Sequence, residues 1–502
     1  MKIIIKHNLN EWIMTKRAQW LIGILLCTLL TAHSLPLFDD GAQDVRYMNF
    51  AMHDEYLITY HVWNMVDQGS LYHGFRVYPG LYPYTVAAMR AIIGPDSLEF
   101  FHIIALRFLS LIISCFALLL TLWLFSRIKY GLWAALILSF WMAWHPETIL
   151  WASRIHPDAL LLLFNQASLA FLMLGAERRD DKYIKIAALL AGFSAGTKLF
   201  GFFIIVAMSI WLIFIYWHNR RHLIRLLLIT SALFLAAFLV VNPYLFVDAA
   251  KVITGLLSQH KRNIHGTSSL WQWWPLLWGS RGFGIVGAFL VLFGIVDGIW
   301  KKDRTTIPVL IFVAVYSSYL FGAVRIDVSR YAIPMMWPLI FLGLRSMVRI
   351  YIENKMIRPM HYATMIAMVV LLICFAVVDI PRMHEAHNDD IEHYNCSLTA
   401  TEIAFGEHLR SYAARANGIV LSRYYIYVPR EIGWLPDWSL PVKRLKRPDD
   451  ILAVVVTKEL QWDKDNEQRF RNGEFGFVWC ETIYDHEIFV PKSRAKLHGC
   501  AL

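Results

Sequence analysis

Long apolar runs without a charged side chain recur along the first 380 positions of this chain. A membrane-spanning helix needs roughly 20 predominantly apolar residues, which few helices of soluble proteins contain. Only 17% of the 502 residues are charged, whereas soluble domains carry about 25%. These features predict an all-α polytopic membrane domain and exclude a plain soluble enzyme. Eleven runs qualify, at 18–36, 101–125, 131–144, 159–176, 186–197, 199–217, 226–246, 282–300, 306–323, 331–344 and 362–380.

Three of the runs, 131–144, 186–197 and 331–344, are short. They predict either helices that flanking residues extend or broken helices that face a protein-lined cavity, where non-helical backbone is tolerated. The first run follows Lys16 and Arg17, as a signal peptide would. It is long, however, and no clean cleavage site of small residues follows it, so we expect a retained first span.

Lys and Arg concentrate in every second segment between the runs. Loops that stay in the cytoplasm collect these residues, so the pattern places the N-terminus inside and the C-terminal segment outside. It also accounts for the excess of 48 Lys and Arg over 38 Asp and Glu without nucleic acid as a partner. The same topology requires Lys198 to lie at the tip of a tight external hairpin, because one tilted helix over 186–217 would invert every later loop.

The tail, residues 381–502, is polar and has the length of one small domain. Residues 418–427, 450–457 and 475–484 are predicted strands, and residues 403–414 a helix. We therefore expect a transmembrane domain over 1–380, with a first outer loop at 37–100, and a soluble outer α/β domain over 381–502. Two of the tail cysteines are expected to pair in an oxidising compartment, and the sequence leaves open which two of Cys396, Cys480 and Cys500.

The first outer loop contains an acidic pair, Asp54 and Glu55, preceded by His53. Adjacent carboxylates suit deprotonation of a hydroxyl or the holding of a cation, because each raises the pKa of the other. A solvated acidic loop is the alternative interpretation. The Tyr-Pro segment at 78–84 that follows is also consistent with an anchor at the membrane interface.

Two positions further along the chain combine charge with apolar surroundings. Arg154 lies four residues before Asp158, at the head of the fourth run. Asp158 is placed either to cap its helix or to pair with Arg154, and Arg154 also suits a phosphate. Lys198 lies between two apolar runs; an ionisable group at membrane depth is a functional candidate, although a lysine there can also reach the interface.

Later outer loops contain further cations. Arg262, in the sequence His260-Lys261-Arg262, suits a lipid head group or a pyrophosphate, with a plain basic interfacial helix as the alternative. Arg330 suits an anionic ligand at the edge of a proline-broken run, with extension to the interface as the alternative. No His or Cys set has metal-ligand spacing, and H-E-x-x-H, G-x-S-x-G and C-x-x-C are absent, which argues against a metalloprotease, a serine hydrolase and a redox relay.

The order of these features resembles the GT-C class of integral-membrane glycosyltransferases. It is more closely similar to the superfamily of dolichyl-phosphate-mannose protein mannosyltransferases and lipid A aminoarabinose transferases, over about residues 18–345, and the outer tail is similar to the tails of bacterial members. The motifs that carry the resemblance are Asp54-Glu55, the Tyr-Pro segment, Arg154 to Asp158, Gly196-Thr197-Lys198, Asn242-Pro243, and Arg330-Tyr331 followed by Pro334.

The resemblance implies transfer of a sugar from a polyprenyl-phosphate carrier to an acceptor hydroxyl at the outer leaflet, in one inverting displacement. It implies Asp54 as the base, with Glu55 orienting it or contacting the sugar. Cationic side chains hold the phosphate, and a few further side chains contact the sugar or acceptor. The expected phosphate ligands are Lys198, Arg330, Arg154 and Arg262, and the expected sugar or acceptor contacts are Asp158, His53 and Tyr82.

The implied partners are the lipid-linked donor, the bilayer, and a glycolipid, polysaccharide or protein acceptor. No cofactor is predicted beyond the donor, although the acidic pair could bind a divalent cation as in some GT-C enzymes. The implied location is the inner membrane of a bacterium, with the tail in the periplasm. The sugar, the acceptor and the linkage are left open.

Three other functions fit a polytopic chain of this kind. A transporter or flippase of lipid-linked glycans often has inverted repeats with paired broken helices, which we do not find here. O-antigen polymerases and ligases usually concentrate their chemistry in a late, large outer loop, whereas the acidic pair lies in the first. A non-catalytic assembly partner would be favoured if Asp54 and Glu55 proved dispensable.

Overall fold

The structure is a computed structural model, and not every part of the chain is described in it. The side chains of some residues within helices, among them those of His53, Asp54 and Arg330, are also outside the description. The chain divides into two compact units, residues 1–38 with 58–392 and residues 39–57 with 393–502. The described residues are 16–38, 53–70, 78–94, 99–247, 249–250, 254, 278–323, 329–353, 358–394, 400–422, 426–429, 431–436, 450–457, 472–473, 475–484 and 486–500.

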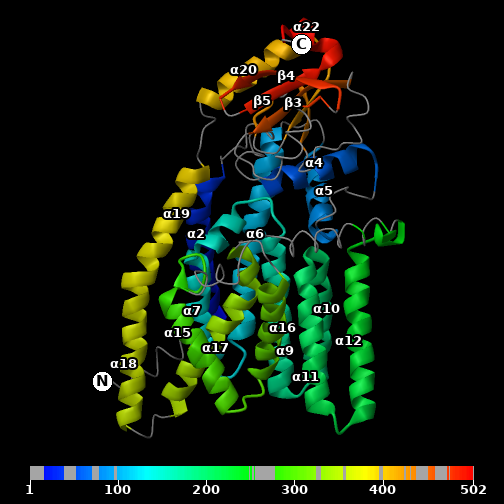
Figure 1. The fold of residues 1–502 in the computed structure, drawn as a ribbon. Coiled ribbons are helices and arrows are strands. Elements are labelled where there is room, and N and C mark those ends of the chain that lie inside the picture. The colour runs from blue at the N-terminus through cyan, green and yellow to red at the C-terminus, as the bar shows by residue number, and fades with distance from the viewer. Residues whose placement is uncertain are drawn as a thin grey trace. The chain divides into compact units, whose positions relative to one another are not determined.

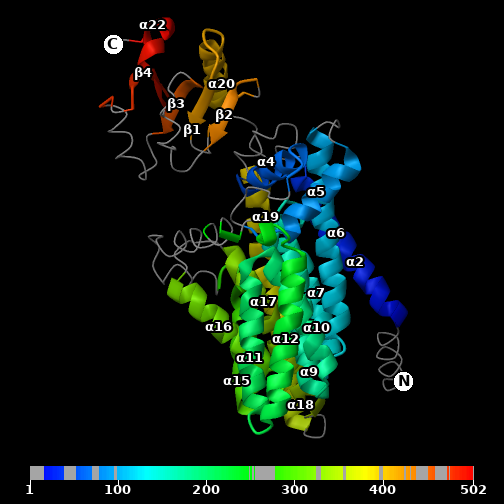
Figure 2. The same ribbon diagram turned by 90° about the vertical axis from the view of Figure 1, so that its right-hand side faces the viewer.

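The first unit is a bundle of long helices that run back and forth (Figures 1 and 2). Each of the eleven predicted runs overlaps one of them. Among the described residues, seven helices are long and apolar enough to cross a membrane, and three further apolar helices, α7, α15 and α16, are shorter. The helices are α2 (Lys16–Ser34), α6 (Glu99–Phe125), α7 (Gly131–Trp144), α9 (Asp158–Arg178), α10 (Asp181–Thr197), α11 (Phe202–Tyr216), α12 (Arg220–Val240), α15 (Gly284–Trp300), α16 (Ile307–Ala323), α17 (Ile333–Glu353) and α18 (Arg358–Cys374).

Shorter helices occupy the segments that the sequence predicts as loops. The first predicted outer loop contains α4 (His53–Asp67) and α5 (Leu81–Ile93), and the second contains α8 (Pro146–Ala152). At the other end of the chain, α18 continues through the π-helical turn Phe375–Asp379 into α19 (Ile380–Tyr394). The helical part of the chain therefore extends beyond the apolar runs.

Paired glycines bring α15 and α17 into backbone contact. A methyl group at Gly294 would lie 2.6 Å from the backbone nitrogen of Gly343, and one at Gly343 would lie 2.2 Å from the backbone oxygen of Leu290. Helices associate closely in membranes through such small residues, because lipid supplies no hydrophobic force between them. Neither glycine can therefore gain a side chain without separating the two helices.

The short run 331–344 continues as helix α17 because two buried arginines have acidic partners. Arg349 pairs with Asp297 of α15, and Arg345 pairs with Asp303 in the turn between α15 and α16. Both arginines are less than a tenth exposed. Of the two alternatives for this run, the extended helix is the correct one.

A carboxylate closes the start of α15. The two oxygens of Asp379 accept hydrogen bonds from the N–H groups of Ile285 and Val286, at 3.0 and 2.9 Å. The first N–H groups of a helix have no partner inside it. Gly284 precedes them at φ +69°, where a methyl group would lie 2.9 Å from the Asp379 carboxylate. Asp379 thus ties the π-helical turn to α15.

The second unit contains helix α20 (Ala400–Ala413) and a five-stranded mixed sheet. Strand β1 is parallel to its neighbours β2 and β3, and β5 is antiparallel to its neighbours β3 and β4. The three predicted strands overlap β1, β3 and β4, and the predicted helix overlaps α20, whereas β2 and β5 were not predicted. The sheet order is β2-β1-β3-β5-β4, with β1 at Ile419–Ser422, β2 at Gly433–Pro436, β3 at Ile451–Thr457, β4 at Phe477–Ile483 and β5 at His486–Pro491.

A disulfide bond joins Cys480 of β4 to Cys500, which follows the short helix α22 (Ala495–His498). This settles the pairing that the sequence left open for these two residues. Cys396 lies outside the described residues. The bond fixes the end of the described chain to an outer strand of the sheet.

Candidate functional site

Lys198 lies in the tight reversal between α10 and α11. Its N–H donates to the Ser194 carbonyl, and the Gly201 N–H donates to the Lys198 carbonyl, both at 3.0 Å. A methyl group at Gly201 would lie 2.1 Å from the Ala195 nitrogen, so the chain can turn this sharply only with glycine there. The predicted break at Lys198 is present, but the residue is only 4% exposed and does not extend to solvent.

The Lys198 ammonium forms an ion pair with Oδ1 of Asp158, the first residue of α9. Both side chains are 5% exposed. Helix α9 has no side-chain cap hydrogen bond, and its N-cap residue is Pro157. The Asp158 carboxylate therefore pairs with the lysine at a neighbouring helix junction. A charge pair of this kind is stable in an apolar interior only when its partners are close and well oriented.

Two further residues continue this ion pair into a chain of polar contacts. His156 Nδ1 lies 2.9 Å from Oδ2 of Asp158, and His156 Nε2 lies 3.0 Å from the Tyr78 hydroxyl oxygen. His156 is fully buried. Neither His156 nor the Tyr78 hydroxyl was among the predicted site residues. Tyr78 is buried, so it is not the interface anchor that its Tyr-Pro context also allowed.

Aromatic rings surround the ammonium. The Lys198 nitrogen lies 5.4 Å from the centre of the Tyr78 ring and 5.9 Å from that of Tyr331. Ring faces attract cations, and the attraction grows when water is excluded. We call Tyr78, His156, Asp158, Lys198 and Tyr331 the Lys198 cluster. It places a buried ammonium beside a carboxylate and two aromatic rings.

The motif Asn242-Pro243 holds the segment that carries Tyr78. The Asn242 side-chain oxygen accepts the Gly80 N–H at 2.6 Å and the Tyr244 hydroxyl at 3.1 Å. The Asn242 side-chain nitrogen donates to the Phe238 carbonyl at 2.6 Å. A methyl group at Gly80 would lie 2.7 Å from the Val241 carbonyl oxygen, so the two segments are in direct backbone contact.

A second polar group adjoins His156. The Trp151 indole is centred 4.5 Å from the His156 ring and donates to Glu147 at 2.8 Å. The other Glu147 oxygen lies 3.6 Å from the Arg281 guanidinium. Glu147 is buried although α8 contains no other charged residue. This glutamate was not among the predicted site residues.

The other predicted site residues with described side chains are Arg154, Tyr82 and Glu55. Arg154 is fully buried in the turn between α8 and α9. The Tyr82 hydroxyl, on α5, lies 3.3 Å from the Ser110 hydroxyl of α6. Glu55 is fully buried in α4. Of all the predicted site residues, the structure brings Asp158 and Lys198 into direct contact.

Four predicted site residues are not placed. Arg262 lies outside the described residues, and the side chains of His53, Asp54 and Arg330 are not described. Their roles stay predictions. Within the described part of the chain, no three His, Cys, Asp or Glu side chains are grouped to hold a metal ion. The expectation about a divalent cation is not tested by this.

A segment of the chain that includes part of the candidate site is similar in sequence to a known family. A family model described as dolichyl-phosphate-mannose-protein mannosyltransferase matches residues 79–245, the segment that contains Asp158, Lys198 and Asn242. No curated protein matches the chain in sequence.

Two crystal structures match nearly the whole chain. They are ArnT from Cupriavidus metallidurans bound to undecaprenyl phosphate, with a TM-score of 0.53 at 12% identity, and the same protein in the apo state, with a TM-score of 0.51 at 13% identity. Each match covers 95% of this chain and 98% of the other. The chain thus has an ArnT-like fold and resembles the GT-C superfamily of dolichyl-phosphate-mannose protein mannosyltransferases and lipid A aminoarabinose transferases.

Proposed function

We propose that this protein transfers a sugar from a polyprenyl-phosphate carrier to an acceptor hydroxyl. The observation that carries the proposal is the Lys198 cluster, a buried ammonium beside Asp158 within the segment matched by the mannosyltransferase model. One of the two similar ArnT structures is bound to undecaprenyl phosphate, a polyprenyl phosphate. The fold and the charge therefore support the same class of donor.

In the proposed reaction the acceptor oxygen attacks the anomeric carbon as the bond from that carbon to the phosphate oxygen breaks. The configuration at the anomeric carbon inverts, the acceptor proton passes to the Asp54 carboxylate, and polyprenyl phosphate leaves with the bonding electrons. A positioned base contributes about 10²–10⁴-fold to such a step. We propose that Glu55 orients Asp54 or contacts the sugar.

Lys198 is proposed to stabilise the departing phosphate. Charge develops on the phosphate oxygens as the bond breaks, and a fixed cation in a site without water stabilises that charge strongly. Asp158 and the rings of Tyr78 and Tyr331 hold the ammonium in place before the donor arrives. Asp158 is a further candidate for contact with the acceptor.

Arg330 is proposed as the second phosphate ligand because it directly precedes Tyr331, whose ring centre lies 5.9 Å from the ammonium. Arg154 and Arg262 are proposed as additional cations. His53 and Tyr82 are proposed to contact the sugar or the acceptor. Because the Tyr82 hydroxyl already lies near Ser110, its part in recognition would be through the ring or the remaining hydrogen-bonding capacity of that hydroxyl.

The proposed location is the inner membrane of a bacterium, with the N-terminus in the cytoplasm and the second unit outside. Two observations support this orientation. Lys and Arg are concentrated in the segments assigned to the inside. The disulfide between Cys480 and Cys500 belongs to an oxidising compartment such as the periplasm.

The proposal is tested by transfer with purified protein in detergent. The donors are a panel of polyprenyl-phosphate monosaccharides, and a membrane extract serves as acceptor. We expect wild type to release polyprenyl phosphate, and Asp54→Asn and Lys198→Ala to lose most of this activity. Lys182→Ala, an exposed lysine on the same α10, is the matched control and should keep it.

Two outcomes would contradict parts of the proposal. Equal release by wild type and Asp54→Asn would keep the transferase and remove Asp54 as its base. If no donor is cleaved, and reconstituted vesicles instead move the intact lipid-linked sugar across the bilayer, the protein is a transporter or flippase. Analysis of the labelled product identifies the acceptor and separates transfer to a glycolipid, a polysaccharide or a protein.

A further inference from the structure

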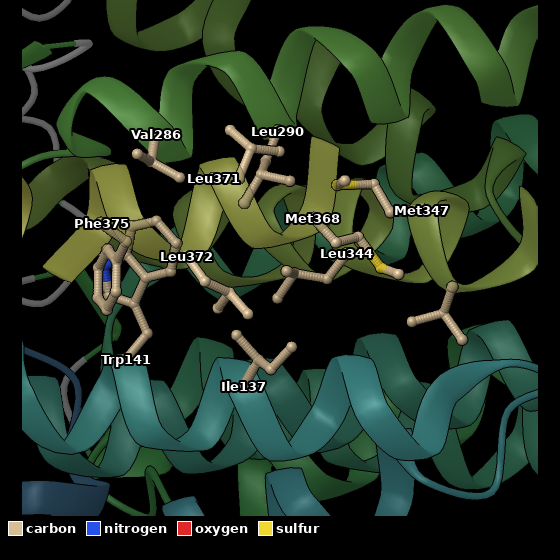
Figure 3. Close-up of a pocket in the computed structure, with 11 residues that line it drawn as sticks. Ile137, Trp141, Val286, Leu290, Leu344, Met347, Met368, Leu371, Leu372 and Phe375 are labelled. Atoms are coloured by element: carbon tan, nitrogen blue, oxygen red, sulfur yellow. The ribbon is translucent and has the colours of Figure 1, made fainter. Parts of the chain in front are cut away.

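An apolar groove lies between α18 and the helices α7, α15 and α17 (Figure 3). Its volume is small, about 60 Å³, which is room for part of one chain-like ligand. Every side chain that lines it is Ile, Val, Leu, Met, Phe or Trp. Such a lining offers no charged group to a sugar or a phosphate, and it suits a hydrocarbon.

One stripe of α18 forms a wall of this groove. Met368, Leu371 and Leu372 of α18 and Phe375 of the π-helical turn that follows all line it, at the spacing that places residues on one face of a helix. Leu372 is itself 49% exposed, and Val370 and Ile373 on the other faces are 50% and 55% exposed. Only 11% of the membrane-spanning window over residues 365–389 is buried. The groove therefore opens beside a loosely covered helix, where the bilayer supplies hydrocarbon chains.

Two guanidinium groups lie beyond the end of the groove that Val286 and Phe375 form. Arg382 of α19 donates to the Trp278 carbonyl, and Arg281 donates to the Ala386 carbonyl, both at 3.3 Å. Arg382 thus contacts the segment that contains Arg281, and Arg281 contacts α19, which contains Arg382. Arg382 is exposed.

The arginines are linked to the groove through Asp379. Arg382 follows Asp379 by one helical turn, and the Asp379 carboxylate holds the Val286 N–H. Arg281 is one-third exposed and also lies 3.6 Å from Glu147. Cations at the end of an apolar groove match an anionic lipid head group.

We propose that this groove binds one acyl chain of an anionic bilayer phospholipid, with the lipid phosphate at Arg281 and Arg382. The site is separate from the Lys198 cluster. Helix α17 packs against α9, which carries Asp158, and also against α7, α15 and α18, which line the groove. The bound acyl chain lies between α18 and the helices α7, α15 and α17. We therefore expect the lipid to stabilise the packing of α18 against these helices.

The test measures lipid retention by the full chain. The protein is reconstituted with phosphatidylglycerol or with phosphatidylcholine, extracted in mild detergent, and weighed intact by native mass spectrometry. Leu371→Trp fills the groove, and Val370→Trp places the same side chain on the exposed face of α18 as the control. We expect wild type and Val370→Trp to retain one more phosphatidylglycerol than Leu371→Trp.

The head-group part of the proposal has its own variant. Arg382→Gln should retain phosphatidylglycerol and phosphatidylcholine equally, whereas wild type should prefer phosphatidylglycerol. If Leu371→Trp does not accumulate, Leu290→Trp fills the groove from α15 and replaces it in the comparison. Equal retention by the filled and control variants would overturn the proposal. The proposal would also be overturned if the protein retained polyprenyl phosphate in place of phospholipid. It would equally be overturned if the protein were a dimer and the groove-filling variants alone lost that dimer.

Discussion

Lys198 and Asp158 are 40 positions apart in the chain and form an ion pair inside the helix bundle. The pair joins the junction of α10 and α11 to the first residue of α9. Both partners are 5% exposed, so neither charge can be solvated by water if the other is lost. Their contribution to stability and their proposed contribution to catalysis can therefore be separated by changing one residue or both.

Lys198→Ala should remove transfer activity and also destabilise the fold. Losing one partner of a buried ion pair costs about 3–5 kcal/mol, because the remaining charge stays in an apolar environment. The double variant Lys198→Ala with Asp158→Asn should recover much of this stability and still lack activity. Thermal unfolding in detergent measures the first effect, and release of polyprenyl phosphate measures the second. A double variant that regains activity would remove Lys198 from the phosphate site.

Tyr78 contributes a hydroxyl and a ring, and two substitutions separate them. Tyr78→Phe loses the 3.0 Å hydrogen bond to His156 and keeps the ring beside Lys198, so we expect a loss of stability of about 1 kcal/mol. Tyr78→Leu also loses the cation–π contact, worth about 0.5–2 kcal/mol. The KM for the donor should therefore rise more in Tyr78→Leu. Equal donor KM values for the two variants would show that the ring does not act on the ammonium.

At the run 331–344, the number of consecutive apolar residues does not predict the length of the helix. The run ends at Leu344, before Arg345, yet α17 continues to Glu353. The arginines are buried because Asp297 and Asp303 come to them from another helix and its following turn. A count along one segment cannot include partners that only the folded bundle supplies. By contrast, the equally short run 131–144 coincides with α7 to the residue.

The candidate site, too, could be predicted only in part from the sequence. Asp158 and Lys198 could be selected from the sequence because a charge between apolar runs is unusual and the order of motifs resembles a known superfamily. Their mutual contact, and the participation of His156, could not. The partner of His156 on its other side is Tyr78, 78 positions earlier, and no local pattern links the two. Glu147 was missed for a related reason, since its partner Arg281 lies in a distant segment.

Acid should weaken the end of the bundle that contains Asp303. Burial alone would raise the pKa of Asp303, but the Arg345 guanidinium and hydrogen bonds from Thr305 and Thr306 outweigh it and lower the pKa below 3.8. The unfolded chain therefore binds the proton more tightly than the folded protein does. The contribution of Asp303 is fully present above its unfolded pKa and is lost as pH falls through the lower, folded value.

The comparison for Asp303 uses Asp303→Asn. Wild type and this variant should show the same trend in melting temperature between pH 7 and pH 5, with wild type the more stable. Below about pH 4, the unfolded pKa of an aspartate, the difference between them should shrink. A difference that stays constant down to pH 3 would show that the Asp303 carboxylate does not stabilise the fold through its charge.

Gly80→Ala should disrupt the support of Tyr78. The added methyl would lie 2.7 Å from the Val241 carbonyl oxygen and 2.6 and 2.8 Å from the rings of Tyr84 and Tyr244. Backbone at Val241 cannot move aside as a flexible side chain can, so we expect a loss of about 1–3 kcal/mol. Asn242→Ala, which removes the acceptor of the Gly80 N–H, should lower the melting temperature in the same direction. Unchanged unfolding of Gly80→Ala would contradict the close contact of these two segments.

The disulfide between Cys480 and Cys500 tests the proposed orientation of the second unit. The two cysteines are 20 positions apart, and closing a loop of this length stabilises a fold by about 3 kcal/mol. Cys500→Ser should therefore lower the melting temperature of the second unit. If this unit lies in an oxidising compartment, peptides prepared from cell membranes without reductant should contain the two cysteines linked to each other. The free Cys374 should be alkylated in the same sample after denaturation, which controls for reagent access. Alkylation of Cys480 and Cys500 without reductant would instead place the second unit in a reducing compartment, because the glutathione and thioredoxin systems keep thiols reduced there.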